Sequence, residues 1–266
     1  MRNSPRLKTA AKLLLIAAIL ALLVLWLRFT PPGLLGKADA VGYAVCHRID
    51  LRSFHLGSRP LPLCARCSGM YLGALASAIY QLRKGRRGGL PPRKLWLPLG
   101  LLGLAFAVDG TNSYLHFFPG FQGLYEPNNT LRLISGTGLG LLIPTLLLPA
   151  FHQTAWAELD PRPALDSWRS LAGLLLAGAG VVLLMLSGNP LILYPLALLS
   201  SATVLAILST CYGLLVLIVV RGDGQARSLR DLWLPLVVGF AIALLQTFAI
   251  DWLRLTFTGT WNGFKL

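Results

Sequence analysis

Charged residues are scarce in this sequence. Asp, Glu, Lys and Arg together make up 13% of the 266 residues, whereas 55% are hydrophobic. Typical soluble domains carry about 25% charged residues, so this composition excludes an ordinary soluble domain and indicates a membrane protein. The basic residues lie between the apolar runs, where they act as topology signals. Despite the formal charge of +14, we therefore expect no nucleic-acid partner.

Cysteine and histidine are also few, and the chain lacks a convincing internal repeat. The missing repeat argues against a transporter built from two inverted halves. The four cysteines and four histidines are unevenly placed, because three of the cysteines and two of the histidines lie between Cys46 and Gly73. We therefore expect this stretch to carry the chemistry of the protein.

Apolar runs near the length of about 20 residues that a bilayer demands recur along the chain. They predict an all-α, polytopic transmembrane helical bundle of about seven spans, forming a single membrane domain over residues 1–266. An N-terminal anchor span is expected within residues 1–30, a motif-bearing core at 45–142, and three C-terminal spans within 171–255. The individual spans are expected at residues 11–27, 63–82, 95–117, 131–151, 171–186, 191–220 and 232–255.

The distribution of Lys and Arg orients these spans. Basic residues precede the first run and crowd the segment Arg83–Lys94 after the second, which predicts a cytoplasmic N-terminus and an extracytoplasmic C-terminus. The sequence Ala38–Ala40 is typical of a signal-peptide cleavage site, but it lies far beyond the first apolar run, so we favour a retained anchor. Cys46–Gly73, the polar loop 109–130 and the start of the fourth span are then all extracytoplasmic.

Cys64 and Cys67 are separated by two residues at the first turn of the second predicted span. At about 100° per residue, positions 64, 67 and 71 share one helix face, so we expect Tyr71 below the two thiols. The opposite face has small residues at a spacing that lets another helix approach closely: Ala65, Gly69 and Gly73.

Cys46 and His47 precede this pair, and three interpretations of the cluster stay open. A redox pair is one, because a Cys-x-x-Cys at a helix N-terminus beside Arg66 should have lowered thiol pKa values, with Cys46 as exchange partner. A plain disulfide that tethers the outer loop is another. A tetrahedral zinc site would take four soft ligands: Cys46, Cys64, Cys67 and either His47 or His55.

A second group of polar residues accompanies the cluster on the same predicted side. Asp109 lies in the outer part of an apolar span, where an acid usually faces the bundle interior. One stripe of the fourth predicted helix holds Asn129, Arg132, Gly136 and Gly140. The two glycines permit a close helix contact that would turn Arg132 inward. Arg132 is expected either to pair with Asp109 or to bind the phosphate or carboxylate of an anionic ligand.

Two further predictions concern the C-terminal spans. Asp251 and Arg254 are three residues apart at the outer end of the seventh span, which predicts a local ion pair. Cys211, near the middle of the sixth span, is expected to be a small buried hydrophobe.

The motifs C-H-R, P-L-C-A-R-C-S-G and N-N-T-L-R-L-I-S-G resemble those of an uncharacterised family, a domain of unknown function, of prokaryotic integral membrane proteins. The resemblance covers roughly residues 45–142. It implies a bacterial or archaeal cytoplasmic membrane and one shared site, but no activity. The positions that match the pattern are Cys46, His47, Arg52, Ser53, Cys64, Arg66, Cys67, Gly69, Asp109, Asn129 and Arg132.

Our leading hypothesis is a membrane protein with an extracytoplasmic Cys/His centre that binds zinc through Cys46, His47, Cys64 and Cys67. A neighbouring polar pocket for an anionic or lipid-linked ligand would be formed by Arg66, Asp109, Asn129 and Arg132. One alternative is a quinone-linked thiol-disulfide oxidoreductase with Cys64 and Cys67 as its active dithiol. Another is a transporter or lipid-handling protein in which the cysteines form a structural disulfide.

Overall fold

A computed structural model describes residues 5–118, 120, 123–220 and 222–264. Within these residues the chain forms mainly helices, with four short strands: β1 (His55–Leu56), β2 (Arg59–Pro60), β3 (Arg87–Gly89) and β4 (Asp160–Pro163). Two 3-10 turns are η1 (Asp50–Arg52) and η2 (Arg93–Leu95). The α-helices are α1 (Pro5–Phe29), α2 (Leu34–Val45), α3 (Ala65–Leu82), α4 (Trp96–Leu115), α5 (Asn129–Ala155), α6 (Trp168–Leu186), α7 (Pro190–Val219) and α8 (Leu229–Thr258).

The helices form the all-α bundle that the sequence predicts. Of those described, six are long and apolar enough to cross a membrane, namely α1 and α4–α8, and they match six of the seven predicted spans. The seventh prediction corresponds to α3, whose polar residues lower its hydropathy. Ser77 and Gln81 of α3 are buried, and they donate hydrogen bonds to Leu141 O (2.9 Å) and Thr145 Oγ1 (3.1 Å) of α5. α3 is thus an interior helix whose polar groups are satisfied by its neighbours.

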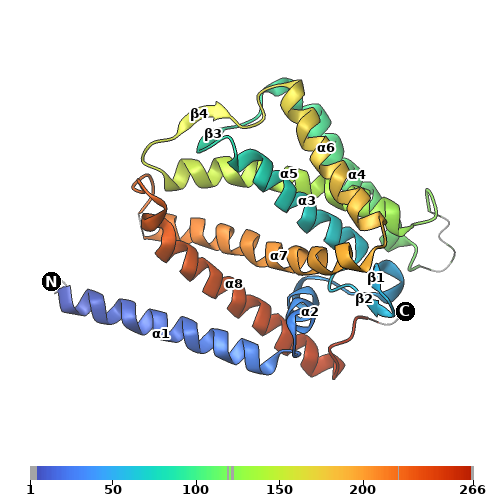
Figure 1. Ribbon diagram of the computed structural model, residues 1–266, viewed down its shortest axis with the longest axis horizontal. Helices are drawn as coiled ribbons and strands as arrows, with labels where there is room; N and C mark the ends of the chain where they lie inside the picture. Colours follow the sequence, from blue (N-terminus) through green and yellow to red (C-terminus); the bar gives the residue numbers. More distant parts are fainter. Residues whose placement is uncertain (1–4, 119, 121–122, 221, 265–266) are drawn as a thin grey trace.

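α3 and α5 lie side by side at very short range (Figure 1). Glycines on both helices allow this approach, because a β-carbon at Gly69 would overlap the carbonyl of Leu133 and one at Gly136 would overlap the carbonyl of Arg66. The small-residue faces predicted from the sequence are therefore the actual contact. As predicted, the contact turns Arg132 inward, and this residue is only 6% exposed.

The two ends of the bundle carry different structures (Figure 1). α2 and the β1–β2 hairpin lie at one end, together with the start of α3 and the end of α8, whereas β3 and β4 lie at the other. The Cys46–Gly73 stretch, the end of α4 and the start of α5 therefore meet at one end, as the alternation of spans predicts. We call it the outer end, in accordance with the predicted orientation.

α2 is a helix that we did not predict. With 12 residues it is too short to span a bilayer, and the sequence assigns its segment to an outer loop. Ala38, Val41 and Gly42 are buried on one face at helical spacing, a signal that the neighbouring charges obscure. Gly42 abuts the carbonyl of Pro62, so α2 packs directly against the segment that leads into Cys64.

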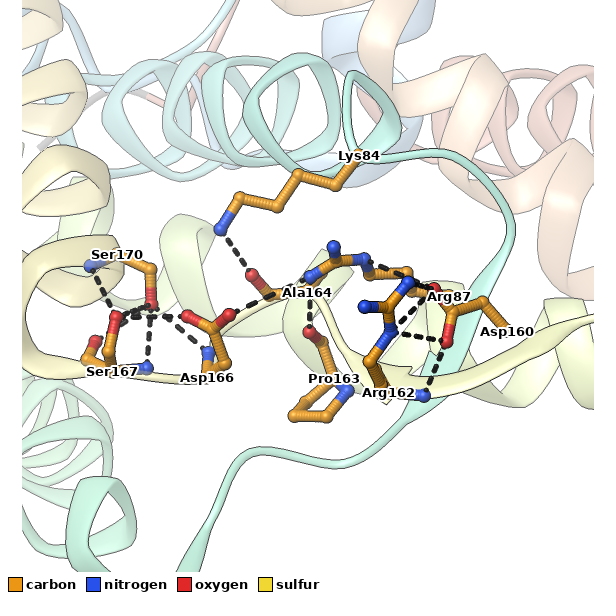
Figure 2. Close-up of polar contacts among 9 residues, drawn as sticks. All are labelled: Lys84, Arg87, Asp160, Arg162, Pro163, Ala164, Asp166, Ser167 and Ser170. Atoms are coloured by element: carbon orange, nitrogen blue, oxygen red, sulfur yellow. Dashed lines mark hydrogen bonds and ion pairs between the residues drawn. The ribbon is translucent and has the colours of Figure 1, made fainter.

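At the opposite end, β3 and β4 pair in parallel, and polar side chains of the two segments contact each other (Figure 2). Arg87 donates to Pro163 O at 3.0 Å, and its guanidinium lies 3.7 Å from Asp160 and 3.8 Å from Asp166. Hydrogen bonds from Arg162 lower the pKa of Asp160 to about 2. The basic segment after α3 is therefore folded against the segment that leads into α6.

α1 lies beside α8 at the edge of the bundle (Figure 1). Large apolar side chains along it, Leu13, Leu14 and Leu20 among them, are more than half exposed. A helix with this exposure is stable in lipid but not in water, in agreement with its apolar composition.

Candidate metal centre and arginine cluster

The site begins where α2 ends. Cys46 is the C-terminal cap residue of α2, and the chain then turns sharply at Arg48, which adopts the left-handed conformation with φ 51°. This turn lets the Cys46 Sγ accept the backbone N–H of Arg48 (3.4 Å) and, from the N-cap of α3, that of Cys64 (3.3 Å). Two N–H donors at one sulfur favour its thiolate form.

Three potential metal ligands converge at this turn. The ligand atoms of Cys46, His47 and Cys64 all lie within 4.8 Å of one another. Cys46 and Cys64 are 6% and 2% exposed, and His47 is half-buried. All four cysteines of the chain are free thiols.

Cys67 lies one helical turn beyond Cys64. It is not in the mutually close set, but its thiol interacts with the thiols of both Cys46 and Cys64. Tyr71 packs against the same cluster, which is the position that helical geometry predicts for it. The face of α3 that carries Cys64, Cys67 and Tyr71 thus contacts Cys46.

The thiols of the cluster differ in pKa. Hydrogen bonds from the thiols of Cys64 and Cys67 hold the pKa of Cys46 well below its usual range, in spite of its burial. Donating to Cys46 raises the pKa of Cys64 to about 12. The sequence predicted lowered pKa values in the Cys-x-x-Cys pair, whereas the activated sulfur is Cys46, because it is the acceptor of the group.

His47 is held by the backbone. Its Nδ1 accepts the N–H of Ile49 at 3.0 Å, so the neutral ring carries its proton on Nε2. Burial lowers the pKa of His47, and the positive charges of Arg52, Arg66 and Arg132 lower it further. A neutral imidazole is the form that binds a metal.

His55 does not belong to this group. It lies in β1, is exposed, and contacts Asp50 at 3.1 Å. Of the two histidines offered by the sequence as the fourth ligand, only His47 is close to the cysteines. Cys211 of α7 is half-buried within the bundle and likewise lies outside the group.

Asp109 is paired, but with Arg66 rather than with Arg132. Arg66 donates to Asp109 Oδ2 through both Nε (3.0 Å) and Nη2 (2.6 Å). Ser135 donates to the same oxygen (2.9 Å), and Tyr125 donates to Oδ1 (3.0 Å). Of the two roles expected for Arg132, the pair with Asp109 is therefore not formed, because Asp109 is bonded to Arg66, Ser135 and Tyr125 instead.

Arg132 is left with little to bind. It donates to Asn129 Oδ1 at 3.0 Å, and its Nε is buried without a partner among the described residues. Arg52 donates to Ser113 O at 3.2 Å and stacks 4.0 Å from the ring of Phe117. Burial and the charges of Arg132 and Arg66 lower the pKa of Arg52.

We use the name arginine cluster for Arg52, Arg66 and Arg132. Their three positive charges lie close together beside His47, and Asp109 is the one acid bonded to them in the described part of the chain. Such an excess of positive charge, partly buried, is costly unless an anion compensates for it. The cluster therefore has the charge that an anion site requires.

An apolar groove of about 560 Å³ opens beside the cluster, between α4 and α5. Leu104, Val108 and Ile134 form part of its walls, and Asp109 and Ser135 lie at its polar end. This arrangement suits a ligand that has a hydrocarbon chain and a polar head.

The C-terminal part of the chain stabilises the Cys46–His47 turn through hydrogen bonds. The sequence analysis did not predict this contact. Arg254 of α8 donates to the carbonyls of Tyr43 (2.6 Å), Cys46 (2.7 Å) and His47 (3.2 Å). Since the last carbonyls of a helix lack partners within it, Arg254 caps α2. The predicted Asp251–Arg254 ion pair is wrong, because the guanidinium donates to these carbonyls and Asp251 has no hydrogen-bond partner among the described residues.

Comparison with known proteins locates the same segment. A family described as "Predicted membrane protein (DUF2085)" matches residues 46–146. An uncharacterized protein of Methanocaldococcus jannaschii is 34% identical over 120 residues, which are 45% of this chain and 71% of that protein. An uncharacterized protein of Methanothermobacter thermautotrophicus is 32% identical over 106 residues, which are 39% of this chain and 86% of that protein. No solved structure matches.

The matched segment begins at Cys46 and ends within α5. It contains the cysteines of the cluster, His47, the arginine cluster and Asp109. The helices α6–α8, and with them Arg254, lie beyond it.

Proposed function

Because this chain belongs to the DUF2085 family of predicted membrane proteins, and the shared segment begins at Cys46, we propose that it is an integral membrane protein with an extracytoplasmic zinc centre. Cys46, His47 and Cys64 are the primary ligands, and Cys67 is the fourth. The arginine cluster beside them binds the head group of an anionic, lipid-linked ligand.

The convergence of three soft donors carries the zinc proposal. Two Zn–S bonds of about 2.3 Å at a tetrahedral angle separate their sulfur atoms by about 3.8 Å. The donor atoms of Cys46, His47 and Cys64 lie within 4.8 Å of one another, so a small inward movement would complete the geometry. Sulfur and imidazole ligands suit zinc rather than magnesium or calcium.

The site also imposes a cost on metal binding. Coordination through His47 Nδ1 would replace the hydrogen bond from Ile49 N, and coordination through Nε2 would require the ring proton to move to Nδ1. A cysteine-rich set with Cys67 as the fourth donor offsets this cost, because thiolates are the strongest zinc ligands available here.

The anionic ligand is supported by charge and by shape. Arg132 has a buried guanidinium nitrogen with no partner among the described residues, and arginine recognises phosphate and carboxylate groups through paired N–H donors. The groove between α4 and α5 has apolar walls and reaches Asp109, the residue that pairs with Arg66. We therefore expect the hydrocarbon part of the ligand in this groove and its head group at Arg132.

The test is metal and thiol analysis on protein purified in detergent without a metal-affinity step. One zinc per chain is expected, and the Cys64→Ala/Cys67→Ala variant should lose it. Cys211→Ala is the matched control, since this cysteine is remote from the cluster and its variant should retain the metal. Wild-type protein with no metal, and with two of the outer thiols blocked until a reductant is added, would contradict the proposal.

That contrary result would favour the second candidate, a quinone-linked thiol oxidoreductase. The lowered pKa of Cys46 beside two thiol donors supports it. Cys46 and Cys64 would form one disulfide, and the two electrons and the thiol proton released would reduce a quinone to a quinol, with a second proton taken from water. Thiol-dependent reduction of a soluble quinone analogue, lost in Cys46→Ser, would identify this activity, and its absence would leave a structural disulfide.

A further inference from the structure

Asp251 of α8 is an acid that the zinc centre and the arginine cluster do not use. The residue is fully buried, and neither carboxylate oxygen has a hydrogen-bond partner in the part of the chain that the structure describes. An unpaired buried carboxylate is strongly unfavourable, and acids within membrane helices usually mark a binding or transport site.

The nearest positive charges are directed elsewhere. Arg254 donates to backbone carbonyls of α2 and its turn, between the rings of Tyr43 (4.0 Å) and Phe264 (4.3 Å). Arg48 is paired with Asp39 at 2.7 Å. These two guanidinium groups act on Asp251 only through space, and neither donates a hydrogen bond to its carboxylate in the described part of the chain.

Asp251 lines a cavity of about 90 Å³ between the end of α1, the end of α8 and the C-terminal tail. One water molecule takes up about 30 Å³ in the liquid, so the cavity has the volume of about three water molecules, which is the scale of a small head group. The other lining residues are Phe29, Phe248, Trp252, Leu255 and Trp261. Four of these five are aromatic.

We propose that this cavity binds an alkylated ammonium group. Aromatic faces attract cations, and a cage of rings with one carboxylate is a recurring way to bind quaternary ammonium. No other side chain that lines the cavity offers an oxygen acceptor, whereas calcium takes about 6–8 oxygen ligands, so the lining side chains alone would not complete its coordination. The three N–H donors of a primary ammonium would likewise lack partners, whereas methyl groups require none.

The rim of the cavity is accessible. Phe29 and Trp252 are 59% and 63% exposed, and both belong to helices that are apolar enough to span a membrane. The ammonium group could therefore belong to a soluble solute or to a lipid head group. The two sources share one chemistry at the site, and the choice of membrane separates them.

The experiment measures equilibrium binding of radiolabelled choline to the full chain in a non-ionic detergent. Asp251→Asn keeps the shape and removes the charge, and it should weaken choline binding at least tenfold. Trp252→Leu should weaken it as well. Glu126→Gln is the matched control, because Glu126 is exposed and its variant changes the net charge by the same amount without affecting the cavity.

The neutral isostere 3,3-dimethylbutanol distinguishes a cation site from an apolar hole. It should compete with choline at least tenfold more weakly than tetramethylammonium does. Equal competition by the alcohol, unchanged binding in Asp251→Asn, or no choline binding to wild-type protein would each overturn the proposal. Folding is checked separately, since removing an unpaired buried charge should leave the melting temperature of Asp251→Asn equal to or above that of the wild type.

The lipid source is tested in nanodiscs. If the head group of phosphatidylcholine is the ligand, wild-type protein should melt at a higher temperature in phosphatidylcholine than in phosphatidylglycerol, and Asp251→Asn should not show this difference. If the ligand is soluble, added choline should stabilise the wild type in phosphatidylglycerol nanodiscs. Failure of both arms would contradict the proposal, and neither arm depends on the zinc centre.

Discussion

Arg66 and Asp109 form a buried ion pair that joins α3 to α4, with Arg66 Nη2 2.6 Å from Asp109 Oδ2. Their side chains are 15% and 4% exposed. Arg66 lies between Cys64 and Cys67, so the pair ties the start of the cysteine helix to the neighbouring span. The geometry of the thiol cluster therefore depends on an acid far away in the sequence.

Breaking this pair should destabilise the protein. Arg66→Met or Asp109→Leu alone should lower the free energy of unfolding by about 3–5 kcal/mol, because each leaves an uncompensated buried charge. The double variant should lose less than the sum of the two. Thermal unfolding in detergent measures both effects. Arg162→Met is the control, since Arg162 pairs with Asp160 on the surface and its replacement should not change the stability detectably. If Arg66→Met changed the stability no more than Arg162→Met does, the expectation would be contradicted.

The contact of α3 with α5 should tolerate no added methyl group. Gly136→Ala places a β-carbon against the carbonyl of Arg66, and the overlap should cost about 1–3 kcal/mol. Gly100→Ala in α4 meets open space and should be neutral or stabilising by up to about 1 kcal/mol. Unfolding of the two variants under the same conditions gives the comparison. Similar stabilities would mean that the close approach is absent in the membrane.

The proposed zinc centre predicts that a chelator destabilises the wild-type protein. A ligand that binds only the folded state stabilises it in proportion to its affinity, so a chelator should lower the melting temperature. Cys64→Ala should make the protein insensitive to the chelator. Cys67→Ala should retain a weaker site, because Cys67 lies outside the mutually close set of ligands. A chelator effect that persists in Cys64→Ala would place the metal elsewhere.

The arginine cluster should respond to phosphate-like anions. Pyrophosphate at about 100 times its Kd would stabilise the folded protein by about 2.7 kcal/mol. Arg132→Gln should remove most of this stabilisation, whereas Arg93→Gln, an exposed change at the other end of the bundle, should not. Melting curves with and without the anion, at low ionic strength, provide the measurement. Identical responses of the two variants would exclude Arg132 as the anion-binding residue.

Patterns within single helices could be read from the sequence. The spans followed from apolar length, and the packing face of α3 followed from Gly69 and Gly73 at a spacing of four. Both are consequences of backbone geometry that holds wherever the helix lies. The inward position of Arg132 followed from the same rule applied to α5.

The ion-pair and hydrogen-bond partners of individual side chains could not be predicted from the sequence in this way. Arg132 was equally compatible with Asp109 and with an anionic ligand, and only the tertiary structure shows that Asp109 pairs with Arg66. Likewise, Asp251 and Arg254 satisfy the i, i+3 rule, yet Arg254 donates to three backbone carbonyls of α2 and the turn that follows it.

The sequence by itself determined that this is a membrane bundle, that three of its four cysteines lie in Cys46–Gly73, and that α3 touches a helix through glycine. These properties depend on composition and on the period of the helix. The tertiary structure decided that Cys46 is the acceptor sulfur, that His47 rather than His55 stands beside it, and that α8 holds the turn. Such choices depend on which distant segments share a few ångströms of space, and nothing in the local sequence encodes that distance.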